Sequence, residues 1–406
     1  MLETTLLARQ PIYDAKLNIQ AFELLFRSSD ATTANFADGN AASSTVLLNA
    51  FTGLPLEDVL EGKPAFVNFT RELLDHDLPI DASRLVIEVL EDVEIDASTI
   101  AAIVKLKQAG YRIALDDYVY ADHHDELLPL ADYIKVDVLN QPWDTVIKLV
   151  MRLRGLKVQL LAEKVETQAM FEDCRDLGFT LFQGYFLARP QVVKGRKLNA
   201  NQQTALQLLS TLRKPDITLR EIEALIQTDA VLTLKILRMV NSAMFNLNRD
   251  IDSIQRATAL LGLDRIRSLA QLLVLAGLDN KPKSLFASTL LRARLGQAMA
   301  EHAQDDALNA DTQFTAGLLS TLDAYLDMNL EDILQGLPIS ANLSAAILHR
   351  QGTSGMLLDT AVAFDQAALE RIDWSQLSGL GIASSTARDL YIDSLRWVSD
   401  VMRSIK

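Results

Sequence analysis

Short apolar runs alternate with helix-forming segments between about residues 60 and 190. The apolar runs predict strands over residues 65–69, 85–90, 113–115, 131–136, 158–162 and 179–182. Helical spacing separates them over residues 98–108, 143–153 and 168–177. Strands that alternate with helices form a parallel sheet with crossover helices. The first half is therefore predicted to be an α/β sheet, either open or closed as a barrel.

Two more strands are predicted before this alternation begins. Residues 4–13 and 17–26 have strand patterns on either side of Asp14-Ala15-Lys16, which predicts a hairpin. Residues 46–60 have a helical pattern.

Polar side chains stand where the predicted strands end, and in barrels of this kind the carboxyl ends of the strands carry the chemistry. These residues are Glu23, Asn68, Glu88, Asp116, Asp117, Lys135, Glu163 and Gln183. All except Lys135 offer oxygen ligands, and an all-oxygen set suits Mg²⁺ or Mn²⁺ rather than zinc. The adjacent carboxylates of Asp116 and Asp117 repel each other near a buried strand, and a divalent cation would remove that cost.

Each of these residues also has a simpler interpretation. One of the two aspartates could cap the next helix while the other is solvated. Glu23 and Arg27 could form an exposed ion pair of little energetic value, and Asn68 could be a turn residue. Lys135 could extend to solvent, and Gln183 could bond to the backbone. Taken singly these interpretations are favoured, but the ordered set favours a site.

Composition and charge limit the class of protein. Of the 406 residues, 49% are hydrophobic and 23% are charged, which predicts a folded chain of two or three domains. The net charge of −14 argues against binding nucleic acid through a general positive field. The single cysteine, Cys174, excludes an intrachain disulfide. We find no secretory signal and no apolar run of membrane-spanning length, so we expect a cytoplasmic protein without membrane insertion.

A polar segment over residues 191–204 marks the best domain boundary, which predicts domains at 1–197 and 205–406. Beyond it the pattern is helical alone, so the second domain is predicted to be all-α. Thr218 and Glu221 have the spacing of a capping box. Helices are predicted over residues 219–226, 232–240, 257–261, 265–278, 288–303, 314–325, 342–349, 357–369 and 385–402.

Residues 1–197 resemble the EAL domain of bacterial cyclic di-GMP signalling. The matching segments follow the family's order: Glu23-Leu24-Leu25-Phe26-Arg27, Val67-Asn68-Phe69, Ile87-Glu88-Val89-Leu90-Glu91, Asp116-Asp117, Ile134-Lys135-Val136-Asp137, Ala162-Glu163-Lys164-Val165-Glu166-Thr167 and Gln183-Gly184-Tyr185. Several ordered matches are far more specific than any one of them. The resemblance implies a TIM-like (β/α)8-type barrel and the cleavage of cyclic di-GMP to linear pGpG.

The resemblance also assigns roles to the site residues. It implies one metal ion held by Glu23, Asn68, Glu88 and Asp116, and a second held by Asp116 with Asp117. Lys135 is expected to orient the attacking water, with Glu163 and Gln183 completing the catalytic set. Arg27 and Glu166 are the expected ligand-binding residues. Mg²⁺ or Mn²⁺ is the expected cofactor, with Ca²⁺ as a substitute that permits binding without turnover.

Two features depart from the EAL pattern. The family has a small-residue loop after its aspartate pair, whereas residues 118–124 here contain no glycine, and bulky residues cannot follow a glycine-dependent path. Glu91, the expected anchor of that loop, is present. Lys164 replaces a glycine of the family. These departures predict a barrel that binds metal and the nucleotide with weak or absent hydrolysis.

Residues from about 205 resemble the HDOD domain, a helical relative of HD phosphohydrolases. The resemblance rests on residues 226–232, 236–243, 253–254 and 259–262. HD enzymes need adjacent His and Asp ligands, but the second half contains only His302 and His349, and neither neighbours an Asp. The resemblance therefore implies a non-catalytic module that binds a protein partner.

Three classes of function remain open from the sequence. We favour a signalling regulator whose EAL-like barrel binds cyclic di-GMP, or has lost even that binding, and whose HDOD domain contacts a protein. An active metal-dependent phosphodiesterase follows closely, and a ligand-free scaffold is third. A homodimer is compatible with each of the three.

Overall fold

The computed structural model describes residues 5–28, 59–75, 80–91, 93–118, 122–184, 207–212, 253–276, 281–305 and 307–404, with isolated residues between 214 and 251. The chain forms two compact units, Met1–Leu187 and Ala188–Lys406. The predicted domain limits at residues 197 and 205 lie outside the described residues.

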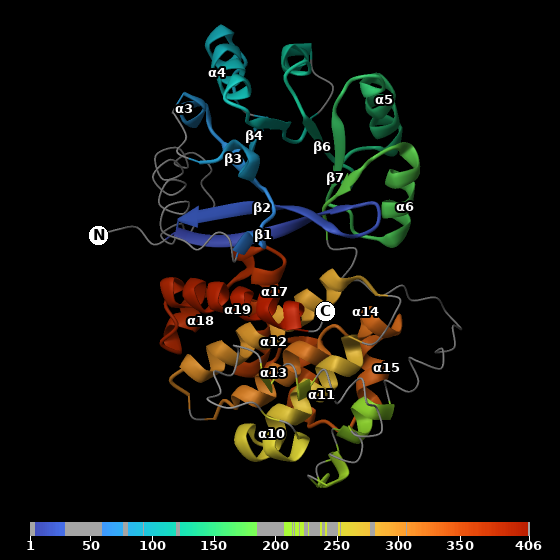
Figure 1. Cartoon of the computed structure of the whole chain (residues 1–406), viewed down its shortest axis with the longest axis vertical. Coiled ribbons are helices and arrows are strands. Elements are labelled where there is room, and N and C mark those ends of the chain that lie inside the picture. The colour runs from blue at the N-terminus through green and yellow to red at the C-terminus, as the bar shows by residue number, and fades with distance from the viewer. Residues whose placement is uncertain are drawn as a thin grey trace. The chain divides into compact units, whose positions relative to one another are not determined.

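The first unit is a closed eight-stranded barrel with the strands in sequence order. Its strands are β1 (Thr5–Asp14), β2 (Ile19–Ser28), β3 (Ala65–Phe69), β4 (Leu85–Val89), β5 (Arg112–Leu115), β6 (Tyr133–Asp137), β7 (Gln159–Glu163) and β8 (Leu181–Phe182). Strand β1 is antiparallel to both β2 and β8, and all other neighbours are parallel. The predicted hairpin is confirmed, and β1 and β2 form the long blue ribbon pair in Figure 1.

Helices connect the parallel strands at positions close to those predicted. They are α3 (Arg71–Leu74), α4 (Ala97–Gln108), α5 (Trp143–Leu153) and α6 (Gln168–Leu177), with 3₁₀ helices η2 (Ala82–Arg84) and η3 (Asp122–Leu127). Asp96 begins α4 by accepting the backbone N–H of Thr99, and Thr167 begins α6 by accepting that of Met170. The predicted helix at 46–60 lies mostly outside the described residues.

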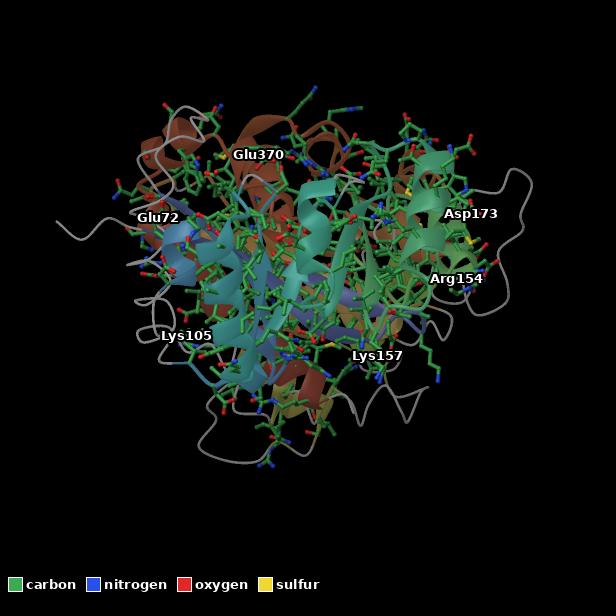
Figure 2. The ribbon with its side chains drawn as sticks, turned by 90° about the horizontal axis from the view of Figure 1, so that it is seen from above. Glu72, Lys105, Arg154, Lys157, Asp173 and Glu370 are labelled. Atoms are coloured by element: carbon green, nitrogen blue, oxygen red, sulfur yellow. The ribbon has the colours of Figure 1, made fainter. Side chains whose placement is uncertain are left out.

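The barrel interior is filled by one apolar layer to which every strand contributes one residue. These residues are Ile12, Ala21, Phe66, Val86, Ala114, Tyr133, Leu161 and Leu181. Large and small side chains share the layer, and the rings of Phe66 and Tyr133 meet edge to face with their centroids 5.0 Å apart. Charged residues on the surrounding helices, such as Lys105 and Asp173, point away from the barrel (Figure 2).

The described part of the second unit is helical, as predicted. Its helices are α10 (Ile254–Leu261), α11 (Leu263–Ala276), α12 (Lys283–His302), α13 (Ala310–Leu319), α14 (Leu322–Leu326), α15 (Leu330–Gln335), α16 (Ala341–His349), α17 (Gly352–Asp365), η6 (Leu369–Arg371), α18 (Trp374–Gly379) and α19 (Ser384–Ser404). The predicted capping box is confirmed, since the Thr218 N–H donates to Glu221 and the Glu221 N–H to Thr218.

The prediction of one helix over residues 314–325 is wrong, because α13 ends at Leu319 and α14 begins at Leu322. The Ser320 hydroxyl donates to the Gly317 carbonyl, and that of Thr321 donates to the Leu318 carbonyl. Such local side-chain bonds compete with the helical ladder and favour a break. Helix α17 also ends at Asp365, before the predicted limit at 369.

Helix α12 packs against α13, α17 and α19. Its Arg292 donates to Asp365 of α17 over 2.7 Å, and both side chains are buried. Gly317 of α13 lies so close to α12 that a Cβ atom there would be 2.4 Å from the Ala293 Cα. A glycine is therefore required at this crossing. Among the described residues, no helix is long and apolar enough to cross a membrane.

Replacing Gly317 by Ala tests this close approach. Alanine favours a helix over glycine by about 1 kcal/mol, but overpacking of this kind costs about 1–3 kcal/mol. We expect the clash to prevail and the free energy of unfolding, measured by urea denaturation, to fall by about 1–2 kcal/mol. The control is Gly296→Ala on α12, where the new Cβ would make only an ordinary contact of 3.6 Å and should leave stability unchanged or raised. Equal effects of the two substitutions on stability would contradict the close approach of α13 to α12 at Gly317.

Candidate functional site

Seven of the predicted site residues belong to the next inward-facing layer of the barrel. Side chains alternate between the two faces of a strand, so a residue two positions from the apolar layer faces the interior again. Moving two residues along each strand toward one rim gives Gln10, Glu23, Asn68, Glu88, Asp116, Lys135, Glu163 and Gln183. The residues predicted from seven separate segments therefore meet at one level of one barrel.

Glu23 does not stand at a strand end, and the prediction was wrong on this point. It lies in the middle of β2, which pairs with β3 only over Phe22–Leu24 and then continues to Ser28 alongside β1. Its carboxylate nevertheless reaches the site, because Glu23 Oε1 lies 3.6 Å from the Lys135 Nζ.

The ammonium group of Lys135 lies at the centre of the layer. Its Nζ is 2.9 Å from Glu88 Oε1, 2.8 Å from Asp116 Oδ1, 3.0 Å from Glu163 Oε1 and 3.6 Å from Glu23 Oε1. Its side chain is only 1% exposed. The alternative in which Lys135 extends to solvent is therefore excluded by the structure.

The site contains more carboxylates than one ammonium group can neutralise. Burial raises the pKa of Glu88 well above its usual value, and burial raises the pKa of Glu163 to about 8. Burial lowers the pKa of Lys135, but the surrounding carboxylates outweigh it and hold that pKa well above its usual value. Lys135 therefore stays charged, while the site favours additional positive charge.

Gln183 links the site to β1. Its amide Nε2 donates to Glu23 and, over 2.7 Å, to Gln10 Oε1. Gln183 is therefore bonded to side chains rather than to the backbone alone. Gln10 was not predicted, although the two-residue period of β1 would have found it once the barrel was assumed.

Several oxygen atoms in this layer are suited to a hard cation. Asn68 Oδ1 and Glu88 Oε2 are buried and receive no hydrogen bond from the described residues. Buried acceptors without donors are costly, and a divalent cation with oxygen ligands would satisfy them. The donor set thus fits Mg²⁺ or Mn²⁺. Among the described residues, however, no three His, Cys, Asp or Glu side chains have the spacing of a preformed metal site.

Asp117 faces Lys164, whereas its neighbour Asp116 contacts Lys135. Its Oδ2 is 3.9 Å from the Lys164 Nζ, and its φ of 38° is in the left-handed region. Burial raises the pKa of Asp117, and the charges of Asp116 and Asp137 add to the effect. Lys164 also donates over 2.5 Å to the buried carboxylate of Asp137.

The remaining predicted residues are less completely defined. Arg27 is in β2, but its side chain lies outside the described residues. Glu166 follows β7 and is partly buried, whereas Glu91 follows β4 and is exposed. The loop that Glu91 was expected to anchor includes residues 119–121, which the structure does not describe. The roles of Arg27, Glu91 and Glu166 stay predictions.

Gly184 fixes the backbone beside Gln183. Its φ is 147°, and a Cβ atom there would lie 2.1 Å from the Val165 carbonyl oxygen. The Val165 N–H in turn donates to the Gln183 carbonyl over 3.0 Å. Only glycine permits this approach, which holds the segments after β7 and β8 together at the site.

Comparisons with known proteins agree with both halves of the chain. The HDOD domain family matches residues 198–332. The chain is 32% identical to cyclic di-GMP phosphodiesterase CdgJ of Vibrio cholerae over 99% of this chain and 94% of that protein.

Solved structures resemble part of the chain. The PaMucR phosphodiesterase in complex with c-di-GMP is 23% identical, with a TM-score of 0.38, over 49% of this chain and 99% of that chain. The Klebsiella pneumoniae BlrP1 manganese/cy-diGMP complex is 24% identical, with a TM-score of 0.36, over 45% of this chain and 55% of that chain.

The protein is thus a two-domain signalling protein with an EAL-type barrel followed by a helical HDOD domain, as its motifs predicted. The similarity extends along nearly the whole chain, so it belongs to the same family as the Vibrio cholerae phosphodiesterase.

Replacing Lys135 by Met tests the charge balance of the site. The substitution removes the ammonium group but keeps much of the side-chain volume, so buried carboxylates lose their shared partner. Removing one member of a buried ion pair costs about 3–5 kcal/mol. We expect the free energy of unfolding in EDTA to fall by about 3 kcal/mol or more in urea denaturation, and Mn²⁺ to restore part of the loss.

The matched control for this experiment is Lys107→Met. Lys107 pairs with Asp132 at 2.7 Å near the surface of the same unit. Partly exposed pairs contribute about 1 kcal/mol or less, so the control should lose little stability. Similar losses for the two variants would contradict a central role for Lys135.

Proposed function

We propose that the barrel is a metal-dependent phosphodiesterase that binds cyclic di-GMP at its rim and hydrolyses it to pGpG. The observation that supports this proposal is the single layer in which Lys135 contacts Glu23, Glu88, Asp116 and Glu163. Each of these residues was assigned to the reaction by the EAL motifs. The name of the Vibrio cholerae relative is consistent with the same activity.

The proposed cofactor is Mg²⁺ or Mn²⁺, held by oxygens of Glu23, Asn68, Glu88 and Asp116. When bound there, the ion would lower the pKa of a water molecule and neutralise charge on the phosphodiester. Ca²⁺ would support binding without turnover.

The chain's own residues have distinct roles in this proposal. The Lys135 ammonium orients the attacking water and remains charged while it does so. Glu163, whose pKa burial raises to about 8, can hold or accept a proton near neutral pH. Gln183 holds the Glu23 carboxylate in place through its amide group. Arg27 and Glu166 would contact the nucleotide outside this layer.

A second candidate is a regulator that binds cyclic di-GMP without hydrolysing it. The observation that favours it is Lys164, which replaces the family's glycine and places an ammonium group beside Asp117. In either case we propose that the HDOD domain binds a protein partner and that the chain forms a homodimer.

One experiment on the purified full chain separates these functions. Cyclic di-GMP is titrated by calorimetry in Ca²⁺, and the same preparation is then incubated in Mg²⁺ or Mn²⁺ while pGpG is measured by chromatography. Product formation supports the phosphodiesterase, and binding without product supports the regulator. If neither binding nor product is detected, the ligand-free scaffold is the only function that remains.

The substitution Glu88→Gln tests the assigned residues. It is nearly isosteric, but it removes a buried carboxylate from the proposed metal site. We expect pGpG formation to fall more than about 100-fold, and binding of cyclic di-GMP in Ca²⁺ to weaken as well. Glu172→Gln on the exposed surface of α6 is the control and should change neither. Unchanged hydrolysis by Glu88→Gln would show that the site is wrongly assigned.

A further inference from the structure

Lys164 follows β7 directly and places its ammonium group between two carboxylates from different segments. Its Nζ is 2.5 Å from Oδ2 of Asp137, the last residue of β6, and 3.9 Å from Oδ2 of Asp117, which follows β5. Its backbone φ of 56° is in the left-handed region, which glycine adopts more readily than lysine. A glycine at this position would leave both carboxylates without an ammonium partner.

The adjacent carboxylates of Asp116 and Asp117 face separate lysines. Asp116 lies 2.8 Å from the buried Lys135, whereas Asp117 faces Lys164. One oxygen of Asp117, Oδ1, is buried and receives no hydrogen bond from the described residues. Asp117 was predicted to be a metal ligand, so the ammonium of Lys164 lies beside a ligand atom.

Asp137 does not need Lys164 to hold its loop. Its Oδ1 accepts the backbone N–H groups of Leu139 and Asn140, each over 2.9 Å. Its Oδ2 also accepts the Asn140 side-chain amide over 2.7 Å. The loop after β6 is therefore already fixed, and the Lys164 ammonium is an additional positive charge at this edge of the site.

We propose that Lys164 competes with a divalent cation for Asp117. Because of this competition, the barrel binds one divalent ion fewer than its carboxylates could hold without the Lys164 ammonium. This inference deepens the proposed function and rests on its assignment of Asp117 as a metal ligand. The Lys164 side chain is 48% exposed, whereas Lys135 is 1% exposed. Lys164 is therefore the cation that a substitution can remove without opening the barrel interior.

The test counts Mn²⁺ ions bound per full-length chain, by electron paramagnetic resonance and calorimetry, without nucleotide. Lys164→Met removes the charge, and Lys164→Gly also relieves the left-handed backbone, which keeps the test valid if the Met variant folds poorly. We expect each of these variants to bind one more Mn²⁺ than the wild type. Lys164→Arg retains the charge and should bind the wild-type number.

A double variant tests where the added ion binds. Lys164→Met combined with Asp117→Asn should return to the wild-type number of Mn²⁺ ions, because the proposed ligand is lost. An unchanged count in both Lys164→Met and Lys164→Gly would overturn the inference, as would an added ion that survives Asp117→Asn. If the wild type binds no Mn²⁺ at all, the proposed function fails, while the difference between variant and wild type still decides the role of Lys164.

Discussion

The structure of the site depends on one ammonium group that four carboxylates share inside a barrel. Lys135 is almost fully buried and lies within 3.6 Å of an oxygen of Glu23, Glu88, Asp116 and Glu163. Carboxylates gathered around one point in a poorly solvated interior repel one another strongly, so the arrangement needs a cation at its centre. The apolar layer beneath it supplies the rigid support, because every strand contributes to both layers. The two-residue alternation of side chains along the strands therefore positions both the apolar layer and the polar site.

The edge of the site is organised differently from its centre. At the centre, Lys135 is enclosed and its partners come from strands, which hold side chains in fixed positions. At the edge, Asp137 is the last residue of β6, Asp117 and Lys164 lie just beyond β5 and β7, and Lys164 is about half exposed. The positive charge of Lys135 at the centre is thus a fixed part of the barrel. The positive charge at the edge comes from Lys164, where the EAL family has a glycine. Replacing Lys164 is therefore expected to disturb the barrel less than replacing Lys135.

Much of the fold was predictable because its signals are local. The alternation of strands and helices, the hairpin before it and the Thr218–Glu221 capping box were read from neighbouring residues and were confirmed. The site residues were found because their motifs occur in order along the chain. The break between α13 and α14 was missed because the apolar period continues across Ser320 and Thr321. The contact of Lys164 with Asp137 was also missed, since it joins loops that only the closed barrel brings together.

We propose that the oxygens around Lys135 hold a divalent cation. Anomalous diffraction at the manganese edge, from crystals of the full chain grown with Mn²⁺, tests it most directly. We expect a strong peak in contact with Glu23, Asn68, Glu88 and Asp116. A well-ordered barrel with no peak among these residues, or with its only peak elsewhere on the chain, would show that they do not form the metal site.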